Sequence, residues 1–513
     1  MSSTDASVLI AGGGLVGLAA SLFLARQGVD VLLVDRHPGV SIHGKARGIS
    51  PRTIEIYRAF GIADAVLAAG RPFDDEAGVA RCASLAGPWE WLSDEQAPRA
   101  IPELSAGESG MADQNAVEPI LIEAARAHGA RYLVNTEVLD TRATEHGVTA
   151  TVRDRATGAE RTITADYLIA ADGNRSPIRE RLGIQRPGAH TFMHTMNIVF
   201  TADLTELLPR RALFWLIMNK ETGFGGGLVS TATPDRWQLS VGYDPATESE
   251  EDFDAERCAT LVHTALGRED IEVGIEGVAA WEQGVGVAQR YRDGRIFLVG
   301  DAAHVWPPAG AMGANTGVQD AHNLAWKLAA VTSGWAGPAL LDTYEAERLP
   351  VANTMAPLIV RHQQARMSGA PEPDDGPSLV AMTFGQHYGT GEVFPADPPA
   401  IATPGARAPH LWLSGQGRRI GLHDLVSDAF VLLTGPDGIA WRAAADKQQG
   451  VPLCAYVIGE DLIDEQHWLP ERYALGTDGA VLIRPDGYVA ARFEAGTVDP
   501  ASALSAALQE ILD

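Results

Sequence analysis

The first residues of the chain form apolar segments of two kinds. Residues 7–11 and 29–35 are short and continuously apolar, and the second (VDVLLVD) is rich in Val. Between them, residues 15–27 carry apolar side chains at the spacing of a helix. Continuous apolar runs are typical of parallel strands that helices cover on both faces. The pattern therefore predicts a βαβ unit at the start of an α/β domain.

The same pattern extends over several later segments. It predicts a helix at 117–127 with Pro119 in its first turn, a strand near 131–135, a small meander at 137–143 and 147–154, and a buried strand at 165–173. Residues 190–285 differ, because they alternate like antiparallel strands, with a helix at 254–267. The α/β pattern resumes at residue 296 and leads into a long helix at 315–333.

The C-terminal part is separated from the rest by a change in composition. Residues 368–408 are rich in Pro, Gly and Asp, which indicates a linker. The last hundred or so residues return to alternating strands and helices, which predicts a third, smaller α/β domain. A chain of 513 residues has room for two or three domains.

Charge and cysteine content exclude several classes of protein. The 66 acidic residues outnumber the 40 basic ones, and the net charge of -26 argues against nucleic acids and anionic membranes as partners. The apolar segment 8–25 contains four glycines and lacks a basic flank, so neither a signal peptide nor a membrane span is expected. Cys82, Cys258 and Cys454 lie far apart, and the His residues lack ligand spacing. We therefore expect a reducing cytoplasm and no metal site.

A glycine-rich turn follows the first predicted strand. Gly12 permits the turn, Gly14 lets a pyrophosphate approach the backbone, and Gly17 lets helix and strand pack closely. Asp35 closes the second strand, where it can accept a hydrogen bond from a ribose hydroxyl. The fingerprint indicates dinucleotide binding but does not distinguish FAD from NAD, and a tight turn in an unrelated α/β protein remains the alternative.

Two further segments combine basic residues with turns. In KARGISPRTIEIYR (45–58), Arg47 lies beside Gly48 ahead of a predicted helix, where it can reach a ligand, although a solvated helix start is the alternative. In IAADGNRSPIRERLG (169–183), Asp172 leaves a buried strand. It could bind a ligand or only cap the next helix.

The fourth segment is GRIFLVGDAAHVWPPAGAMGANTGVQDAHNLAWKL (294–328). Asp301 stands at the carboxyl end of a strand, where open α/β sheets hold ligands. Gly310, Gly313 and Gly317 permit close approach of a ligand to the backbone, and the helix near Asn315 directs N–H groups towards it. Asp301 could also be an ordinary helix-entry residue, and His304 beside it is more often structural. A nicotinamide cofactor explains the first segment alone, whereas FAD explains all four.

On these motifs, with Gln114 in DQNAVEPIL, the chain resembles the class A flavoprotein monooxygenases over residues 8–350. Within these FAD-dependent aromatic hydroxylases it is most similar to the bacterial branch that tailors aromatic polyketides, such as aklavinone 11-hydroxylase and the angucycline hydroxylases. The resemblance implies an α/β fold of the para-hydroxybenzoate hydroxylase type: a Rossmann-like FAD-binding domain (1–75, 105–185 and 285–365), an inserted antiparallel-sheet substrate domain (76–104 and 186–284), a linker (366–408) and a thioredoxin-like domain (409–513).

The resemblance also implies site residues. Arg47 would tune the flavin and Pro308 would pack beside its ring. The implied contacts to FAD are Gly12, Gly14, Leu15, Val16, Gly17, Asp35, Arg36, Arg47, Gln114, Val138, Asp172, Asp301, Pro308, Gly310, Gly313, Ala314 and Asn315. For the substrate, the favoured contacts are Trp215, Phe224 and Trp237. Cys454 is the lone cysteine of the C-terminal domain, which excludes a dithiol role there.

The implied reaction is insertion of one oxygen atom from O2 into a polycyclic aromatic substrate through a flavin C4a-hydroperoxide, with NADPH or NADH as electron donor. A Baeyer–Villiger or epoxidase variant and a flavin-bearing binding protein remain alternatives, and the oligomeric state is expected to be monomer or homodimer. A flavin-dependent halogenase is disfavoured, because Leu-Ser-Asp follows Trp89-x-Trp91 where an Ile-Pro pair would be expected.

Overall fold

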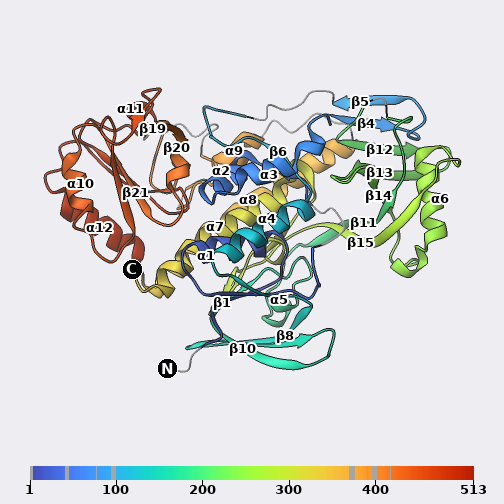
Figure 1. Cartoon of the computed structure of the whole chain (residues 1–513), viewed down its shortest axis with the longest axis horizontal. Coiled ribbons are helices and arrows are strands. Elements are labelled where there is room, and N and C mark those ends of the chain that lie inside the picture. Colours follow the sequence, from blue (N-terminus) through green and yellow to red (C-terminus); the bar gives the residue numbers. More distant parts are fainter. Residues whose placement is uncertain are drawn as a thin grey trace.

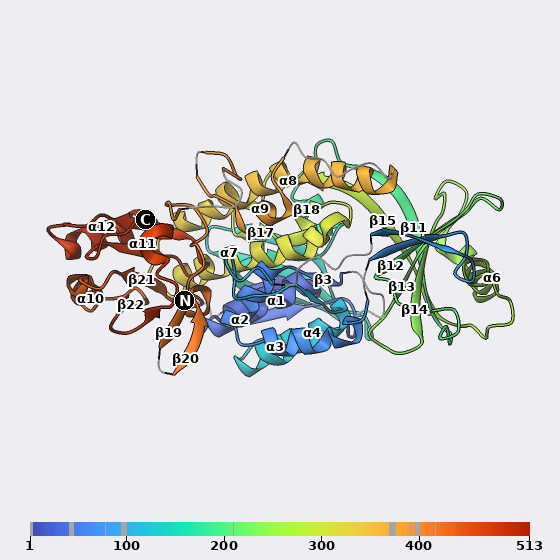
Figure 2. The same cartoon turned by 90° about the horizontal axis from the view of Figure 1, so that it is seen from above.

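The computed structural model describes residues 4–40, 46–76, 78–93, 100–208, 210–368, 376–389, 391–395, 401–415 and 417–513. These residues form three parts that lie in a row along the long axis (Figures 1 and 2). A mostly parallel sheet with its helices occupies the middle, a large mostly antiparallel sheet lies at one end, and the C-terminal part lies at the other.

The central sheet is built on the predicted βαβ unit. Strands β1 (Ala6–Ala11) and β2 (Val31–Val34) are parallel, and α1 (Leu15–Arg26) connects them. The sheet has the order β16-β17-β10-β1-β2-β7, and β8 and β9 extend it from β10. Their bounds are β7 Arg131–Leu133, β8 Thr136–Thr144, β9 Gly147–Asp154, β10 Glu160–Ala170, β16 Arg292–Asp293 and β17 Ile296–Leu298.

Helices pack tightly on this sheet. The apolar segment 8–25 is a fully buried strand followed by a helix whose residues 17–25 are also buried, which explains its composition. Over the described parts of the chain, no helix combines the length and hydropathy that a bilayer crossing needs.

Helices α4 (Gln114–Ala127) and α7 (Met312–Thr332) pack against α1. Both begin earlier than the periodicity predicts, because their first turns contain polar and small residues.

The second sheet has the order β18-β15-β11-β14-β13-β12-β4-β5. Its strands are β4 Val79–Cys82, β5 Trp89–Ser93, β11 His190–Thr201, β12 Phe214–Asn219, β13 Phe224–Ser230, β14 Arg236–Gly242, β15 Gly274–Val287 and β18 His304–Val305. Helix α6 (Ala255–Leu266) covers the face that points away from the central sheet (Figure 2). Cys258, Val262 and Leu266 of α6 pack there into a buried apolar cluster with alternate residues of the strands.

The C-terminal part contains a four-stranded sheet of order β22-β21-β24-β25, with β21 and β22 parallel and the other pairs antiparallel. Its elements are β21 Phe430–Thr434, α10 Ile439–Ala445, β22 Leu453–Val457, α11 Leu469–Tyr473, β24 Ala480–Ile483, β25 Val489–Phe493 and α12 Pro500–Leu512. A βαβ unit followed by a β-hairpin and a helix is the arrangement typical of thioredoxin-like domains.

The segment predicted as a linker is only partly one. Helix α8 runs from Asp342 to Ser368, and α9 (Leu379–Phe384) follows within the Pro/Gly-rich region. Met382, Phe384 and Tyr388 are buried, so residues around α9 belong to the packed structure. The short apolar run LVAMTF of α9 was missed in the sequence because residues that favour turns surround it on both sides.

A buried ionic cluster joins the C-terminal part to α2 (Pro51–Ala59). Glu55 of α2 is 1% exposed and accepts hydrogen bonds from Arg407, Arg52 and Ser105. Burial by itself raises the pKa of Glu55, but the attraction of Arg407 and the neighbouring cations outweighs burial and holds the pKa well below its usual value. Glu55 is therefore ionised, and both guanidinium groups depend on it.

We predict that Glu55→Gln destabilises the protein by about 3–5 kcal/mol, because it leaves buried guanidinium charges without their counter-ion. Glu90→Gln is the matched control, since Glu90 pairs with Arg81 at the surface, where the two side chains are 64% and 41% exposed. The control is expected to cost less than about 1 kcal/mol. Denaturant unfolding monitored by circular dichroism measures both, and equal losses would contradict the prediction.

The stabilisation that Glu55 provides is expected to depend on pH. Ionised Glu55 contributes stability above the unfolded carboxyl pKa of 4.5, and this contribution is lost as the pH falls towards the lower pKa of the folded state. The difference in unfolding free energy between wild type and Glu55→Gln should therefore be constant near neutral pH and shrink below 4.5. Parallel curves down to the acid transition would show that Glu55 is not ionised in the folded protein.

Candidate functional site

The glycine turn after β1 is closed on one side and open on the other. A Cβ atom on Gly12 (φ 112°) would lie 2.2 Å from the carbonyl oxygen of Ala171, and one on Gly17 would lie 2.0 Å from that of Gly12. By contrast, a Cβ on Gly14 would have no neighbour within 4 Å. Gly14 is the N-cap of α1, and no side chain caps that helix end. The turn thus presents open backbone and uncapped N–H groups, which suits a phosphate group.

Asp35 stabilises this turn from the end of β2. Its Oδ2 accepts a hydrogen bond of 2.5 Å from the Gly13 N–H, and its Oδ1 accepts one of 2.6 Å from the His37 N–H. Arg36 beside it is exposed and donates to the His37 ring. The carboxylate therefore has a fixed orientation at the edge of the turn.

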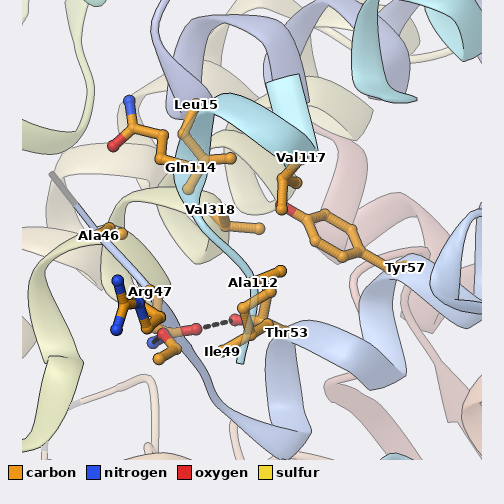
Figure 3. Close-up of a pocket in the computed structure, with 13 residues that line it drawn as sticks. Leu15, Ala46, Arg47, Ile49, Thr53, Tyr57, Ala112, Gln114, Val117 and Val318 are labelled. Atoms are coloured by element: carbon orange, nitrogen blue, oxygen red, sulfur yellow. Dashed lines mark hydrogen bonds between the residues drawn. The ribbon is translucent and has the colours of Figure 1, made fainter. Parts of the chain in front are cut away.

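A small cavity lies beside the turn (Figure 3). It is formed by the first residues of α1, α4 and α7 together with α2 and the short strand β3 (Gly48–Ile49), which pairs with β6 (Gly110–Met111). Its lining consists of Leu15, Ala46, Arg47, Gly48, Ile49, Thr53, Tyr57, Ala112, Gln114, Val117, Ala314, Asn315 and Val318. Three helix N-termini thus converge on one space, which favours negative charge there.

Tyr57 was not predicted as a site residue, because it lies on the apolar face of α2. Its side chain lines the cavity, and its hydroxyl points inwards next to Val117 (Figure 3). The residue is 1% exposed, and its hydroxyl has no hydrogen-bond partner among the described residues. Burial raises the pKa of Tyr57, so the hydroxyl stays protonated. A buried donor of this kind fits a cavity that holds a polar ligand.

Arg47 connects the cavity to the second sheet. Its Nε donates to Asp113 Oδ1 at 2.9 Å, its Nη2 donates to the carbonyl oxygen of Ser230 at the end of β13, and its Nη1 lies 3.8 Å from Glu76. The guanidinium also lies 4.2 Å from the centroid of the Phe73 ring. Burial raises the pKa of Glu76. The position of Arg47 therefore depends on both the start of α4 and the second sheet.

Asn315 holds the start of α7 against β3 and α2. Its amide donates to the carbonyl oxygens of Gly48 (3.0 Å) and Ala311 (2.6 Å), and its Oδ1 accepts from the Ser50 N–H (2.9 Å) and the Thr53 hydroxyl (2.6 Å). The side chain of Asn315 is thus fully used within the protein. Any ligand at this helix end would instead meet backbone N–H groups, including those of Gly313 and Ala314.

The loop before α7 is strained and closely packed. Gly310 (φ 70°) and Ala311 (φ 54°) both adopt the left-handed conformation, which is unfavourable for Ala. A Cβ atom on Gly48 would lie only 2.7 Å from the Cβ of Ala311. The glycine at position 48 thus permits β3 to approach the loop. Pro308 and Gly310 are exposed on the other side of the loop.

Residues next to this loop are fixed by buried charges. Asp301 is exposed, and its carbonyl oxygen accepts from Arg186. His304 has the structural environment that the sequence favoured, since its Nε2 lies 2.6 Å from buried Asp320, which also accepts from Arg348 at 2.8 Å. These contacts hold β18 and α8 on α7.

Several predicted site residues lie elsewhere or have other contacts. Asp172 accepts from the Ser176 hydroxyl (2.6 Å) and the Ile178 N–H (3.0 Å) at the start of α5 (Pro177–Arg181), so the helix-capping alternative describes its contacts. Burial raises the pKa of Asp172, although these hydrogen bonds act to lower it. Val16 packs against Gly300 and Gly317, and Val138 packs against the main core from β8. Neither lines the cavity.

The aromatic residues proposed to face the substrate are not gathered at the cavity. Trp215 (0% exposed) and Trp237 (2%) lie in the apolar cluster between the second sheet and α6, with Phe224 packed at its edge. The Trp237 N–H donates to the Ala202 carbonyl oxygen within that cluster. Large aromatic side chains can pack in the core on one face of a sheet or contact a ligand on the other, so their residue type alone did not show which face they occupy.

Comparison with known proteins identifies the family. The FAD binding domain family matches residues 5–357, and the family of aromatic-ring hydroxylase C-terminal domains matches residues 402–513. Tetracenomycin A2 monooxygenase-dioxygenase of Streptomyces glaucescens is 40% identical, over 100% of this chain and 98% of its own length.

Two solved structures are similar over nearly the whole chain. The ternary complex of aklavinone-11 hydroxylase with FAD and aklavinone has a TM-score of 0.89 and 36% identity, and it covers 100% of both chains. The flavin-dependent monooxygenase PieE in complex with FAD and substrate has a TM-score of 0.86 and 32% identity, over 99% of this chain and 100% of that one. The chain therefore belongs to the FAD-dependent aromatic-ring hydroxylases, and it is an FAD-dependent aromatic monooxygenase.

Proposed function

We propose that this monooxygenase inserts one atom of O2 into a polycyclic aromatic substrate of the polyketide type, with NAD(P)H as the electron donor. The observation that carries the proposal is the convergence of three helix N-termini on a cavity that Arg47 connects to the second sheet. Relatives named for tetracenomycin A2 and aklavinone support a polycyclic phenolic substrate. Bound FAD would supply the redox and oxygen chemistry, and the protein would supply binding, orientation and electrostatics.

Different residues at and beside the cavity would bind different parts of FAD. The uncapped start of α1 at Gly14 would bind the pyrophosphate, and Asp35 would accept from a ribose hydroxyl. The buried hydroxyl of Tyr57 would donate to a polar group of the cofactor. Backbone N–H groups at the start of α7 would stabilise negative charge on the flavin ring. This assignment also supports the division into a FAD-binding domain (1–75, 105–185 and 285–365) and a substrate domain (76–104 and 186–284).

Arg47 would couple the cofactor to the substrate. It lines the cavity while its guanidinium donates to Ser230 of the second sheet and to Asp113. A ligand that moves this sheet would therefore also move the guanidinium of Arg47. Pro308, in its exposed loop, would lie beside the flavin ring. Closure of the sheet over the cavity would exclude water from the reacting atoms.

The decisive test is oxidation of NADPH by the FAD-loaded enzyme against a panel of polycyclic phenols. We predict that a substrate raises the rate of NADPH oxidation at least tenfold and yields a product that contains one atom of 18O from 18O2. A flavin-bearing binding protein would bind the phenols without either effect. Insertion next to a carbonyl, which changes the carbon skeleton, would instead indicate a Baeyer–Villiger reaction.

Gly48→Ala tests the packing of the loop at the start of α7. The added methyl group would lie 2.7 Å from the Ala311 Cβ, so the loop must shift away from β3. We predict at least about tenfold weaker FAD binding, measured by flavin fluorescence during reconstitution of the apoprotein. Gly39→Ala is the control, because a Cβ there has no neighbour within 4 Å. FAD affinity that is unchanged in both variants would remove this contact from the cofactor site.

A further inference from the structure

Two turns lie side by side at one edge of the central sheet. One follows β10 and contains Asp172 and Asn174, and the other is the short helical turn η3 (Gly300–Ala302), which follows β17. Strands β10 and β17 are parallel neighbours, so their carboxyl ends meet at the same edge. Asp301 of η3 is exposed. The direction of its side chain therefore depends on how the backbone of η3 is held.

One guanidinium group connects the two turns. The Nη1 of Arg186 donates to the carbonyl oxygen of Asn174 at 3.0 Å and to its side-chain Oδ1 at 2.9 Å. The Nη2 of Arg186 donates to the carbonyl oxygens of Asp301 and Ala302, the second at 3.2 Å. Two successive carbonyl groups of η3 are thus fixed by a single side chain that also holds the neighbouring turn.

The charge of Arg186 is not balanced by an ion pair. Arg179 donates to the carbonyl oxygens of Asn174 and Ala302 as well, at 3.0 and 3.4 Å, so two cations share these groups. Among the described residues, no carboxylate forms an ion pair with Arg186. Burial and the repulsion of Arg179 lower the pKa of Arg186 to about 10, and the attraction of Asp301 only partly offsets them. Arg186 therefore stays charged at neutral pH and acts on both the backbone and the carboxylate of Asp301.

The backbone of Arg186 belongs to the crossing between the central part and the second sheet. Strand β11 begins shortly after it, and β15 brings the chain back beside β11 (Figure 1). The Gln289 N–H donates to the Gln185 carbonyl oxygen at 3.0 Å and holds the two crossings together. A Cβ on Gly286 of β15 would lie 3.2 Å from the Cδ of Arg186, so the side chain passes over bare backbone there. The second sheet thus fixes the stem of Arg186.

We propose that Arg186 is a positioning residue, which holds η3 so that the carboxylate of Asp301 is directed towards FAD. The inference rests on the proposed function, because it takes Asp301 as one of the residues that contact the cofactor. A planar guanidinium can donate to two turns at once, whereas the ammonium of a lysine donates from a single atom. No motif pointed to Arg186, since it lies outside the four segments that the sequence singled out.

A double-mutant cycle on FAD affinity tests the proposal, with flavin fluorescence measured during reconstitution of the apoprotein. Arg186→Met keeps the stem without its donors, and it should weaken FAD binding at least about tenfold. In the Asp301→Ala background the same change should weaken binding less than about twofold, because Arg186 acts through the missing carboxylate. Arg175→Met is the control and should match its parent in both backgrounds, because the Arg175 side chain is 81% exposed on the turn after β10.

Equal losses of affinity in the two backgrounds would show that Arg186 only stabilises the fold and would overturn the proposal. FAD affinity of Arg186→Met within twofold of wild type would overturn it as well. Arg186→Lys keeps the charge and should still bind FAD at least about threefold more weakly. It replaces Arg186→Met in the cycle if the melting temperature shows that the Met variant does not fold.

Stimulation of NADPH oxidation by polycyclic phenols is measured separately on the wild-type holoenzyme. Its absence would contradict the proposed function, while the cycle would still decide whether Arg186 acts through Asp301, because FAD affinity is measured without substrate.

Discussion

The site depends on the four hydrogen bonds of the Asn315 side chain. They join the first turn of α7 to β3 and to the N-cap of α2, so one side chain holds together three segments that are far apart in the sequence. Because the amide is 4% exposed, each of these bonds is protected from competition by water. Ala311, whose backbone is in the unfavourable left-handed conformation, is held in place by its carbonyl oxygen, which accepts from Asn315.

This unit is in turn attached to the C-terminal part. Helix α2 carries Ser50 at its start and Glu55 one turn later, and Glu55 holds Arg407 from beyond α9. A second buried group acts on α7, where Lys327 and Arg484 share Glu347 of α8. Burial lowers the pKa of Lys327 to about 8, in spite of the attraction of Glu347. The C-terminal part, which has a lone exposed cysteine, therefore contributes charges that fix the helices around the cavity.

The second sheet serves two purposes through its alternating side chains. One face packs against α6 through a buried apolar cluster, and the other faces the central part of the molecule, where Ser240 donates to Asn197 (Figure 2). Arg47 connects this sheet to the central part of the molecule, because its guanidinium donates to Ser230 while its backbone borders β3.

The βαβ unit, the glycine turn with Asp35, the long helix α7 and the family could all be predicted from the sequence, because these features are local and their periodicity or spacing is read directly from the chain. It also indicated that Arg47, Gln114 and Asn315 belong near one ligand, and the structure places all three on one cavity. The packing of the chain was needed to show which side of the second sheet Trp215 and Trp237 occupy, and that Asp172 caps a helix. It was also needed to show that α9 belongs to the packed structure and that Tyr57 directs a buried hydroxyl into the cavity. These properties depend on which surface packs against which, and strand alternation fixes that two faces exist without specifying which one is inside.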